Sequence, residues 1–352
     1  MTKDESRLLK GIAIMMMLWL HLFSNEDTVN EQCFNFLYWG RHPLSYTLTK
    51  LASMCVPIYI IIGGYGLAAT YRNTCGDMHN LKRATLLMIN FWLVFLIFVP
   101  MGMVYRQDIF PGSLTEFVLN LTAACSSYNG AWWFLLPYVI LVLCSQPLIR
   151  RLFKADKLNI IYIVLCFLIL YISSYIAKDH ISQAPDILPC LLLTIVNFAY
   201  FLFIFGLGIL AYRYDVFSRL RIFIGRYNTS HVNIYMITIL LLLCLLRMII
   251  GKSALLNFPF VCLMIPIFVL LPKPQRLTTC LLLIGKHSTN MWLCHFFFIN
   301  DLLNNQIFLL RYPLLIWGTL MTVSLATSML VTVIFTRIKY RMRNILQNQQ
   351  LF

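Results

Sequence analysis

Ten long stretches of almost uninterrupted apolar residues recur along this chain, and they constrain its fold more than any other feature. About 20 apolar residues in a helix are enough to cross a bilayer. Helices are the expected form, because backbone polar groups in lipid must hydrogen-bond within their own segment. The predicted spans are residues 7–25, 45–71, 84–104, 131–149, 158–177, 188–212, 230–250, 254–271, 281–300 and 313–336.

The composition agrees with a chain that lies mostly in lipid. Of its 352 residues, 60% are hydrophobic and 12% are charged, whereas soluble domains have ~45–50% apolar and ~25% charged residues. No stretch is long and polar enough to form a separate soluble domain, so we expect residues 1–352 to form one transmembrane domain. The predicted fold class is all-α, a polytopic membrane protein with about ten transmembrane helices.

The net charge of +15 fits this topology. A basic chain can bind nucleic acid, but the distribution of the charges favours another explanation. With the N-terminus inside and ten spans, both termini are cytoplasmic and 21 of the 28 Lys and Arg residues fall on the cytoplasmic side. Cytoplasmic loops of membrane proteins carry this excess. We therefore expect the lipid bilayer as a partner and no nucleic acid.

The first span carries two ionisable residues, Lys10 near the predicted cytoplasmic surface and His21 eleven residues later. Eleven residues make about three helical turns, so the two side chains share one face, about 16 Å apart. Ionisable groups at membrane depth are functional candidates by default. A long ligand with an anionic head at Lys10 and a reactive end at His21 fits this spacing, and acyl-coenzyme A has that shape. The alternative is an ordinary cytoplasmic lysine and a hydrogen-bonded interfacial histidine.

A second segment, at the start of the ninth span, again places a cation before a histidine. It runs from Gly285 through Lys286 and Ser288 to His295. Ser288 is predicted to be an N-cap, and His295 lies about two turns further along the helix. The alternative is that His295 only makes a contact between helices.

A third segment, in the second span, contains Gly63, Gly64 and Gly66 around Tyr65. Glycines permit the close approach of two helices, or of the backbone to a ligand, and both explanations stay open. The eleven cysteines show no zinc-type spacing. Cys33 and Cys125 both lie in predicted outside loops, where pairing is conceivable, but apolar filling is the default interpretation of these cysteines.

Together these segments resemble the acyltransferase-three family of bacterial membrane O-acyltransferases. A basic residue, ten intervening residues and then a histidine in the first span is that family's hallmark, here Lys10 and His21. The family's other segments, in order, are similar to Ile62-Gly63-Gly64-Tyr65, to Trp133-Phe134-Leu135 and to Gly285-Lys286-x-Ser288…His295. The sequence departs from the family at Gly63, where Ser is usual, and at Lys82-Arg83, where paired arginines are frequent.

The resemblance implies an enzyme of the bacterial plasma (inner) membrane that modifies polysaccharides. It would move an acyl group, usually acetyl, from acyl-CoA to a hydroxyl of a cell-envelope or surface glycan. It would need no metal and no tightly bound cofactor, since acetyl-CoA is the donor substrate. The alternative is a membrane transporter that exports a glycan or its precursor without acyl transfer. A membrane scaffold without chemistry is a third interpretation.

The resemblance also implies roles for particular residues. His21 and His295 would be catalytic, with His21 as the general base, because a neutral imidazole with a pKa near ~6.5 suits that work at neutral pH. A transient acyl-histidine is the alternative mechanism. The predicted substrate- and CoA-binding residues are Lys10, Tyr65, Lys82, Arg83, Lys286 and Ser288.

Overall fold

A computed structural model describes residues 1–71, 78–182, 185–227, 229–251 and 253–349. Within these ranges the regular structure is helical apart from one antiparallel pair of two-residue strands, β1 (Tyr38–Trp39) and β2 (His42–Pro43). The helices of the first half are α1 (Lys3–Phe23), α2 (Glu26–Gln32), α3 (Leu44–Ala52), α4 (Cys55–Tyr71), α5 (Met78–Tyr105), α6 (Leu114–Leu121), η1 (Gly130–Phe134), α7 (Leu135–Leu143), α8 (Ser145–Lys154) and α9 (Lys157–Lys178). Those of the second half are α10 (Ile187–Arg213), α11 (Val216–Ile224), α12 (Thr229–Ile249), η2 (Ala254–Leu256), α13 (Asn257–Leu270), α14 (Gln275–Phe297), η3 (Phe298–Leu302), α15 (Asn304–Phe308) and α16 (Pro313–Gln349).

Each of the ten predicted spans coincides with helix. In the described part of the chain, seven helical segments are long and apolar enough to cross a membrane, and a bent pair, Gly130–Leu143 with Ser145–Lys154, makes eight. Of the other two predicted spans, α13 has only 14 residues and α14 does not reach the same apolarity. The chain is therefore an all-α polytopic membrane protein, while the count of ten and the cytoplasmic termini stay predictions.

Two predicted spans are not single helices. The span predicted at 131–149 bends by 54° between α7 and α8, and Pro147 explains why one straight helix is unfavourable there. Proline has no backbone N–H, so it is tolerated in the first turn of a new helix and not in the middle of a long one. The span predicted at 45–71 is likewise interrupted between α3 and α4.

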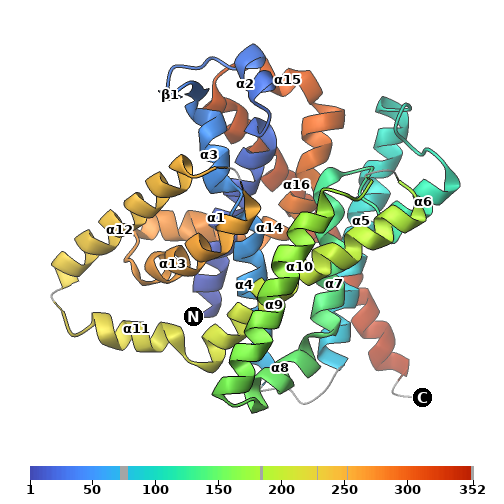
Figure 1. The fold of residues 1–352 in the computed structure, drawn as a ribbon. Coiled ribbons are helices and arrows are strands. Elements are labelled where there is room, and N and C mark those ends of the chain that lie inside the picture. The colour runs from blue at the N-terminus through green and yellow to red at the C-terminus, as the bar shows by residue number, and fades with distance from the viewer. Residues whose placement is uncertain (72–77, 183–184, 228, 252, 350–352) are drawn as a thin grey trace.

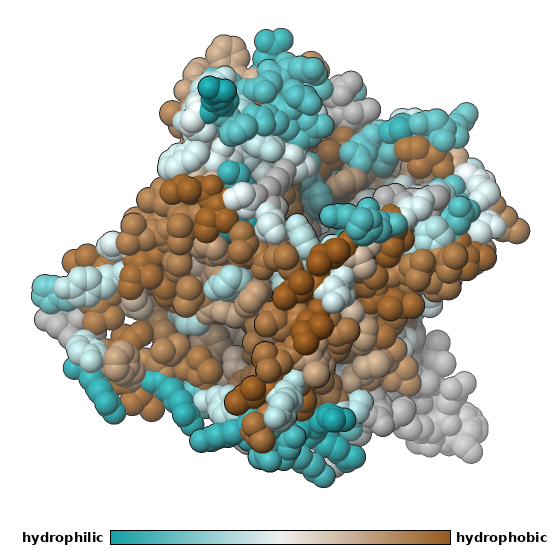
Figure 2. Space-filling model, viewed as in Figure 1, coloured by the Kyte–Doolittle hydropathy of each residue, from teal (hydrophilic) through white to brown (hydrophobic). Residues whose placement is uncertain are grey.

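The surface of the molecule has the layering of a membrane protein. Figure 2 shows an apolar band across the middle of the visible face, with hydrophilic residues gathered above and below it. In Figure 1, α1, α4 and α14 lie in the middle of the bundle, between α12 and α13 on one side and α5 and α7 on the other. The central helices carry the predicted site residues.

The direction of insertion is open to a direct test. Reporter fusions after Arg151 and after Arg343 are both expected to report cytoplasm, because the positive charges predict an even number of spans between the termini. A signal from outside at either position would contradict the count of ten. Two residues of the charge distribution, Arg72 and Lys252, lie outside the described residues.

Helices α1 and α14 touch backbone to backbone at Gly11 and Gly285. A Cβ added at Gly285 would lie 2.0 Å from the carbonyl oxygen of Arg7, and one added at Gly11 would lie 2.5 Å from that of Leu281. No side chain fits in these places. The two glycines therefore allow the two helices that carry His21 and His295 to pack at the closest possible distance.

Replacing Gly285 by alanine is expected to destabilise the protein by about 1–3 kcal/mol, because a methyl group in this contact forces the two backbones apart. Gly318 on α16 is the matched control, since a Cβ there would meet nothing within 4 Å. Gly318→Ala is expected to be neutral or to stabilise by ~0.5–1 kcal/mol. Equal unfolding midpoints of the two variants in a detergent-denaturation series would contradict this role of Gly285.

The glycines of α4 serve two different purposes, helix packing and cavity lining. A Cβ at Gly64 would lie 2.2 Å from the carbonyl oxygen of Phe205, and one at Gly208 would lie 2.3 Å from that of Ile61, so Gly64 serves the packing of α4 on α10. Gly63 and Gly66 instead line a cavity. Both explanations of the segment, close helix approach and an open backbone surface, therefore apply, each at its own position.

Candidate active site

A cavity lined by several of the predicted site residues lies between α1, α4, α5, α7 and α14 and has a volume of about 340 Å³. Ligand pockets in proteins have volumes of roughly 300–1,000 Å³, so this cavity can hold a substantial part of a cofactor-sized molecule. Its lining residues are Ser6, Lys10, Met17, Val56, Tyr59, Ile62, Gly63, Gly66, Leu67, Arg83, Ala84, Leu87, Phe134, Tyr138, Val139, Val142, Ser288, Thr289 and Trp292.

One end of the cavity is basic. Lys10 is half-buried in its wall, and Arg83 lines it from α5 while donating a hydrogen bond to the hydroxyl of Thr70 (3.1 Å). The other two basic residues predicted to bind CoA, Lys82 and Lys286, are exposed and do not line the cavity. The structure thus brings together two of the four basic residues among the predicted substrate- and CoA-binding residues.

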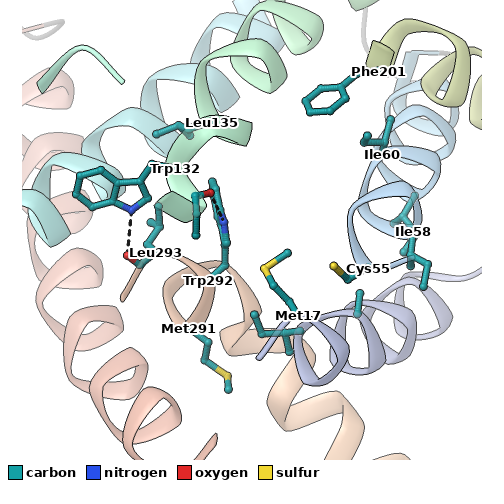
Figure 3. Packing of buried hydrophobic residues seen from close by; sticks show 14 of the residues in the cluster. Met17, Cys55, Ile58, Ile60, Trp132, Leu135, Phe201, Met291, Trp292 and Leu293 are labelled. Atoms are coloured by element: carbon teal, nitrogen blue, oxygen red, sulfur yellow. Dashed lines mark hydrogen bonds between the residues drawn. The ribbon is translucent and has the colours of Figure 1, made fainter. Parts of the chain in front are cut away.

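The other end of the cavity closes on Met17 and Trp292, which lie side by side in Figure 3. The indole N–H of Trp292 donates to the carbonyl oxygen of Ala131 (3.0 Å), and the ring packs edge-on against Phe134 (5.4 Å between centroids). These contacts hold Trp292 in place. Met17 is unbranched and flexible, so it is the more adaptable side of this boundary.

His21 and His295 form a pair just beyond this boundary. Their ring centroids are 5.1 Å apart, and Phe296 packs edge-on against His21 at 4.9 Å. His21 follows Met17 by four residues, which is about one turn or 6 Å along α1. The cavity therefore does not reach His21, and the predicted shared face of Lys10 and His21 is interrupted at Met17.

The hydrogen bonds of His295 define its protonation. Its Nδ1 lies 2.8 Å from the carbonyl oxygen of Trp292 and 3.2 Å from that of Met291. Carbonyl oxygens only accept, so Nδ1 carries the proton and Nε2 has a free lone pair. Nε2 is fully buried and has no partner in the described part of the chain. Buried polar atoms are nearly always satisfied, and an exception calls for an explanation such as a catalytic role.

His21 is half-buried, and its ring nitrogens make no hydrogen bond to any residue the structure describes. The alternative of a hydrogen-bonded interfacial histidine therefore lacks the bond that it requires. A ring with both nitrogens available, next to a second ring with a free lone pair, is suited to accept and pass on a proton.

The two histidines meet because their helices are in register. His21 follows Gly11 by ten residues, and His295 follows Gly285 by ten residues. Gly11 and Gly285 are in contact, and α1 and α14 run in the same direction from that point. Equal rises along two parallel helices bring equal positions to the same level. Met17 and Trp292 meet in the same way, six and seven residues beyond the glycines.

Tyr65, a predicted binding residue, does not line the cavity. The hydroxyl of Tyr65 accepts a hydrogen bond from the Met1 ammonium (2.7 Å), and its ring packs on Tyr212 and Phe217, away from the cavity. Burial of that ammonium lowers its pKa below the usual value. Tyr65 thus fixes the N-terminus of the chain in the described structure.

Ser288 lines the cavity, but the prediction that it caps a helix was wrong. Helix α14 begins at Gln275, so Ser288 lies in its interior, and its hydroxyl donates to the carbonyl oxygen of Gly285 (3.0 Å). A serine hydroxyl in a helix can bond back to the preceding turn in this way. Neighbouring His287 faces away, toward Ser328 on α16 (3.2 Å).

Two tyrosines of the cavity were not among the predicted residues. Tyr59 donates to the carbonyl oxygen of Lys10 (3.2 Å), and Tyr138 lies where a side chain at position 63 would project, 2.8 Å from a Cβ built on Gly63. Glycine at position 63 thus leaves room for the Tyr138 phenol. The sequence showed that glycine replaces the usual serine at position 63, but it did not show that Tyr138 on α7 lies beside that position.

No group of three or more potential metal ligands lies together within the described ranges. Cys33 and Cys125 are both free thiols, so the conceivable pairing between them is not formed.

Comparison with known proteins gives one result. Residues 4–337 match the family described as "Acyltransferase domain". No curated protein and no solved structure matches the chain. The match covers nearly the whole chain, from the start of α1 into α16, and therefore includes every residue of the site.

Proposed function

Because the chain belongs to the acyltransferase-three family, we propose that it is a membrane-bound O-acyltransferase that uses acyl-CoA, in the usual case acetyl-CoA, as its donor. The acceptor is a hydroxyl of a cell-envelope or surface glycan, and the protein resides in the bacterial plasma membrane. Acyltransferase activity follows from the family, while the donor, the acceptor and the residue roles belong to this proposal.

The donor would bind in the cavity with its phosphates at the basic end. Lys10 and Arg83 supply two cations for them, and cations at a helix surface bind phosphate oxygens through charge-assisted hydrogen bonds. Met17 lies seven residues, about 10 Å, beyond Lys10 along α1. The thioester would then lie at Met17 and Trp292, one turn before His21.

In the transfer step, the acceptor oxygen forms a bond to the thioester carbonyl carbon and the carbon–sulfur bond breaks. His21 takes the proton of the attacking hydroxyl and returns it to the departing sulfur, so CoA leaves as the thiol. His295 accepts a hydrogen bond or the proton through Nε2, which positions His21. Displacement of the Met17 side chain, by rotation about its flexible bonds, would connect the donor to the histidine pair.

The single observation that carries this proposal is the histidine pair just beyond one end of a cavity whose other end is basic. Neither residue is explained by packing alone, since His21 makes no hydrogen bond to the described residues and Nε2 of His295 is buried and unsatisfied.

The proposal is tested by comparing cell-surface glycans with and without this protein. Its presence is expected to add O-linked acyl esters, which mass spectrometry detects and mild alkali removes. Unchanged ester content combined with altered glycan export would favour the transporter. Purified protein that neither binds nor turns over acetyl-CoA would favour a scaffold.

A further inference from the structure

Two further cavities lie at the opposite end of the bundle, where α9 ends and α10 begins. Their volumes are about 210 Å³ and 290 Å³, and both are lined by Trp133, Lys178 and Asn197. Because they meet at these three residues, they form one outer site, which we define as the union of the two linings. None of its residues lines the donor cavity except Val56.

The outer site lies one residue layer away from the histidine pair. Leu20, the residue before His21, lines the smaller cavity. Gly130 lines the larger cavity, and a Cβ on Gly130 would lie 3.2 Å from the ring of Phe296, which itself packs on His21. Neither imidazole lines the two cavities, so the ring of Phe296 separates the larger cavity from His21.

The side chains of the outer site are those that bind sugars. Trp133 contributes an aromatic ring, one face of which lies under the Lys178 ammonium, and Tyr175 and Tyr200 add phenol groups. Asn197 is 4% exposed, and its amide makes no hydrogen bond to the part of the chain that the structure describes. A buried amide without a partner inside the protein has unused donors and acceptors for a ligand.

The lining that the two cavities share carries a positive charge, that of Lys178. The ammonium of Lys178 lies over the Trp133 ring, 4.3 Å from its centroid, and is the one charged group in the lining of the larger cavity. Asp179 is the one carboxylate of the smaller cavity, and it is exposed.

A second cation lies directly behind the wall. Arg247 is fully buried, and the acceptors around its guanidinium in the described residues are the amide oxygen of Asn257 (2.8 Å), the hydroxyl of Ser53 (3.2 Å) and backbone carbonyls. Both Asn257 and Ser53 line the smaller cavity. A buried cation neutralised only by dipoles favours an anion nearby, because its field is weakly screened in a low dielectric.

We propose that the outer site binds the acceptor and that the acceptor is acidic, a sugar that carries a carboxylate. The sugar ring packs beside Trp133, its carboxylate pairs with Lys178, and one hydroxyl reaches His21 past the ring of Phe296. This inference rests on the proposed function and names the substrate class that it leaves open. It makes Lys178 a specificity-determining residue, since its ammonium would pair with the carboxylate of an acidic sugar and has no such partner on a neutral one.

The test uses the full-length protein in lipid nanodiscs and two probes, galacturonate and glucuronate trisaccharides, each supplied as the free acid and as the methyl ester. The acid is expected to bind about tenfold tighter than its ester, the effect of one charge-assisted contact. Lys178→Gln should abolish this difference, and Lys178→Arg should retain most of it. Lys157→Gln, at the other end of the same helix, is the matched control and should change nothing.

The sugar-binding measurements are made on protein that has been shown to bind acetyl-CoA. A failure of the acidic-acceptor proposal can then be distinguished from a failure of the proposed function. If acetyl-CoA binds and is turned over in a His21-dependent manner, but no acid binds better than its ester, the acidic acceptor is wrong and the acyltransferase stands. The same conclusion follows if Lys178→Gln keeps the preference. If acetyl-CoA neither binds nor reacts, both proposals fail.

Discussion

Replacing His21 by alanine is expected to lower the rate of acyl transfer by about 10²–10⁴-fold, the usual contribution of a general base. His21 is the group that would take the proton of the attacking hydroxyl, and nothing else in the described site has two free ring nitrogens at this position. The rate is measured as transfer of radiolabelled acetyl from acetyl-CoA by purified protein. Binding of CoA should change less than twofold, because Lys10 and Arg83 remain in place.

His42→Ala is the matched control for this prediction. His42 is also a histidine, but it is exposed at the far end of the bundle and pairs with Glu26 (2.5 Å). Its removal should leave acyl transfer within a factor of about two, as is usual for a surface substitution. If the His21→Ala variant were as active as the His42→Ala variant, the assignment of His21 as the general base would be wrong, whatever the family of the chain.

Replacing Gly66 by phenylalanine is expected to abolish donor binding without unfolding the protein. Gly66 lines the donor cavity, and a Cβ there would meet nothing within 4 Å, so a ring at this position enters empty space. The volume of about 340 Å³ cannot hold both a phenyl ring and the CoA chain. We expect the Kd for acetyl-CoA to rise at least about 100-fold, which corresponds to ~2.7 kcal/mol.

A series of side chains of increasing size at position 66 distinguishes a steric block of the cavity from a general loss of folded protein. Gly66→Ala should bind acetyl-CoA almost normally, and Gly66→Leu should fall between alanine and phenylalanine. Gly318→Phe places the same ring at another open glycine, on α16, which does not line the donor cavity. Loss of binding in Gly318→Phe, or full binding in Gly66→Phe, would show that this cavity is not where the donor binds.

The sequence predicted the helices well because their cause is local. An apolar run of span length allows few alternatives to a helix, so each of the ten predictions coincides with helix. The interruptions at Cys144 and between α3 and α4 were missed, since the apolar pattern continues through both. The interior position of Ser288 was missed for a related reason: residues 275–280 are too polar to be assigned to the span, yet they extend α14.

The candidate site was predictable only in part. Periodicity placed Lys10 and His21 on one face of α1, because that relation lies within a single helix. It could not show that Met17 interrupts this face, that Trp292 closes the cavity, or that Tyr65 binds the N-terminus. These contacts join residues far apart in the chain, and no local pattern encodes them. The same holds for Lys178, which reads in sequence as the ordinary end of a span.

The contact of Gly11 with Gly285 has a consequence for how this protein can vary. Adding one residue between Gly11 and His21 would turn the imidazole by about 100° around α1 and shift it about 1.5 Å, so the ring would leave His295. A compensating insertion in α14 would restore the level of the two rings but not the direction in which each one points. Insertions and deletions should therefore be excluded from both ten-residue intervals, while the loops of the chain remain free to change in length.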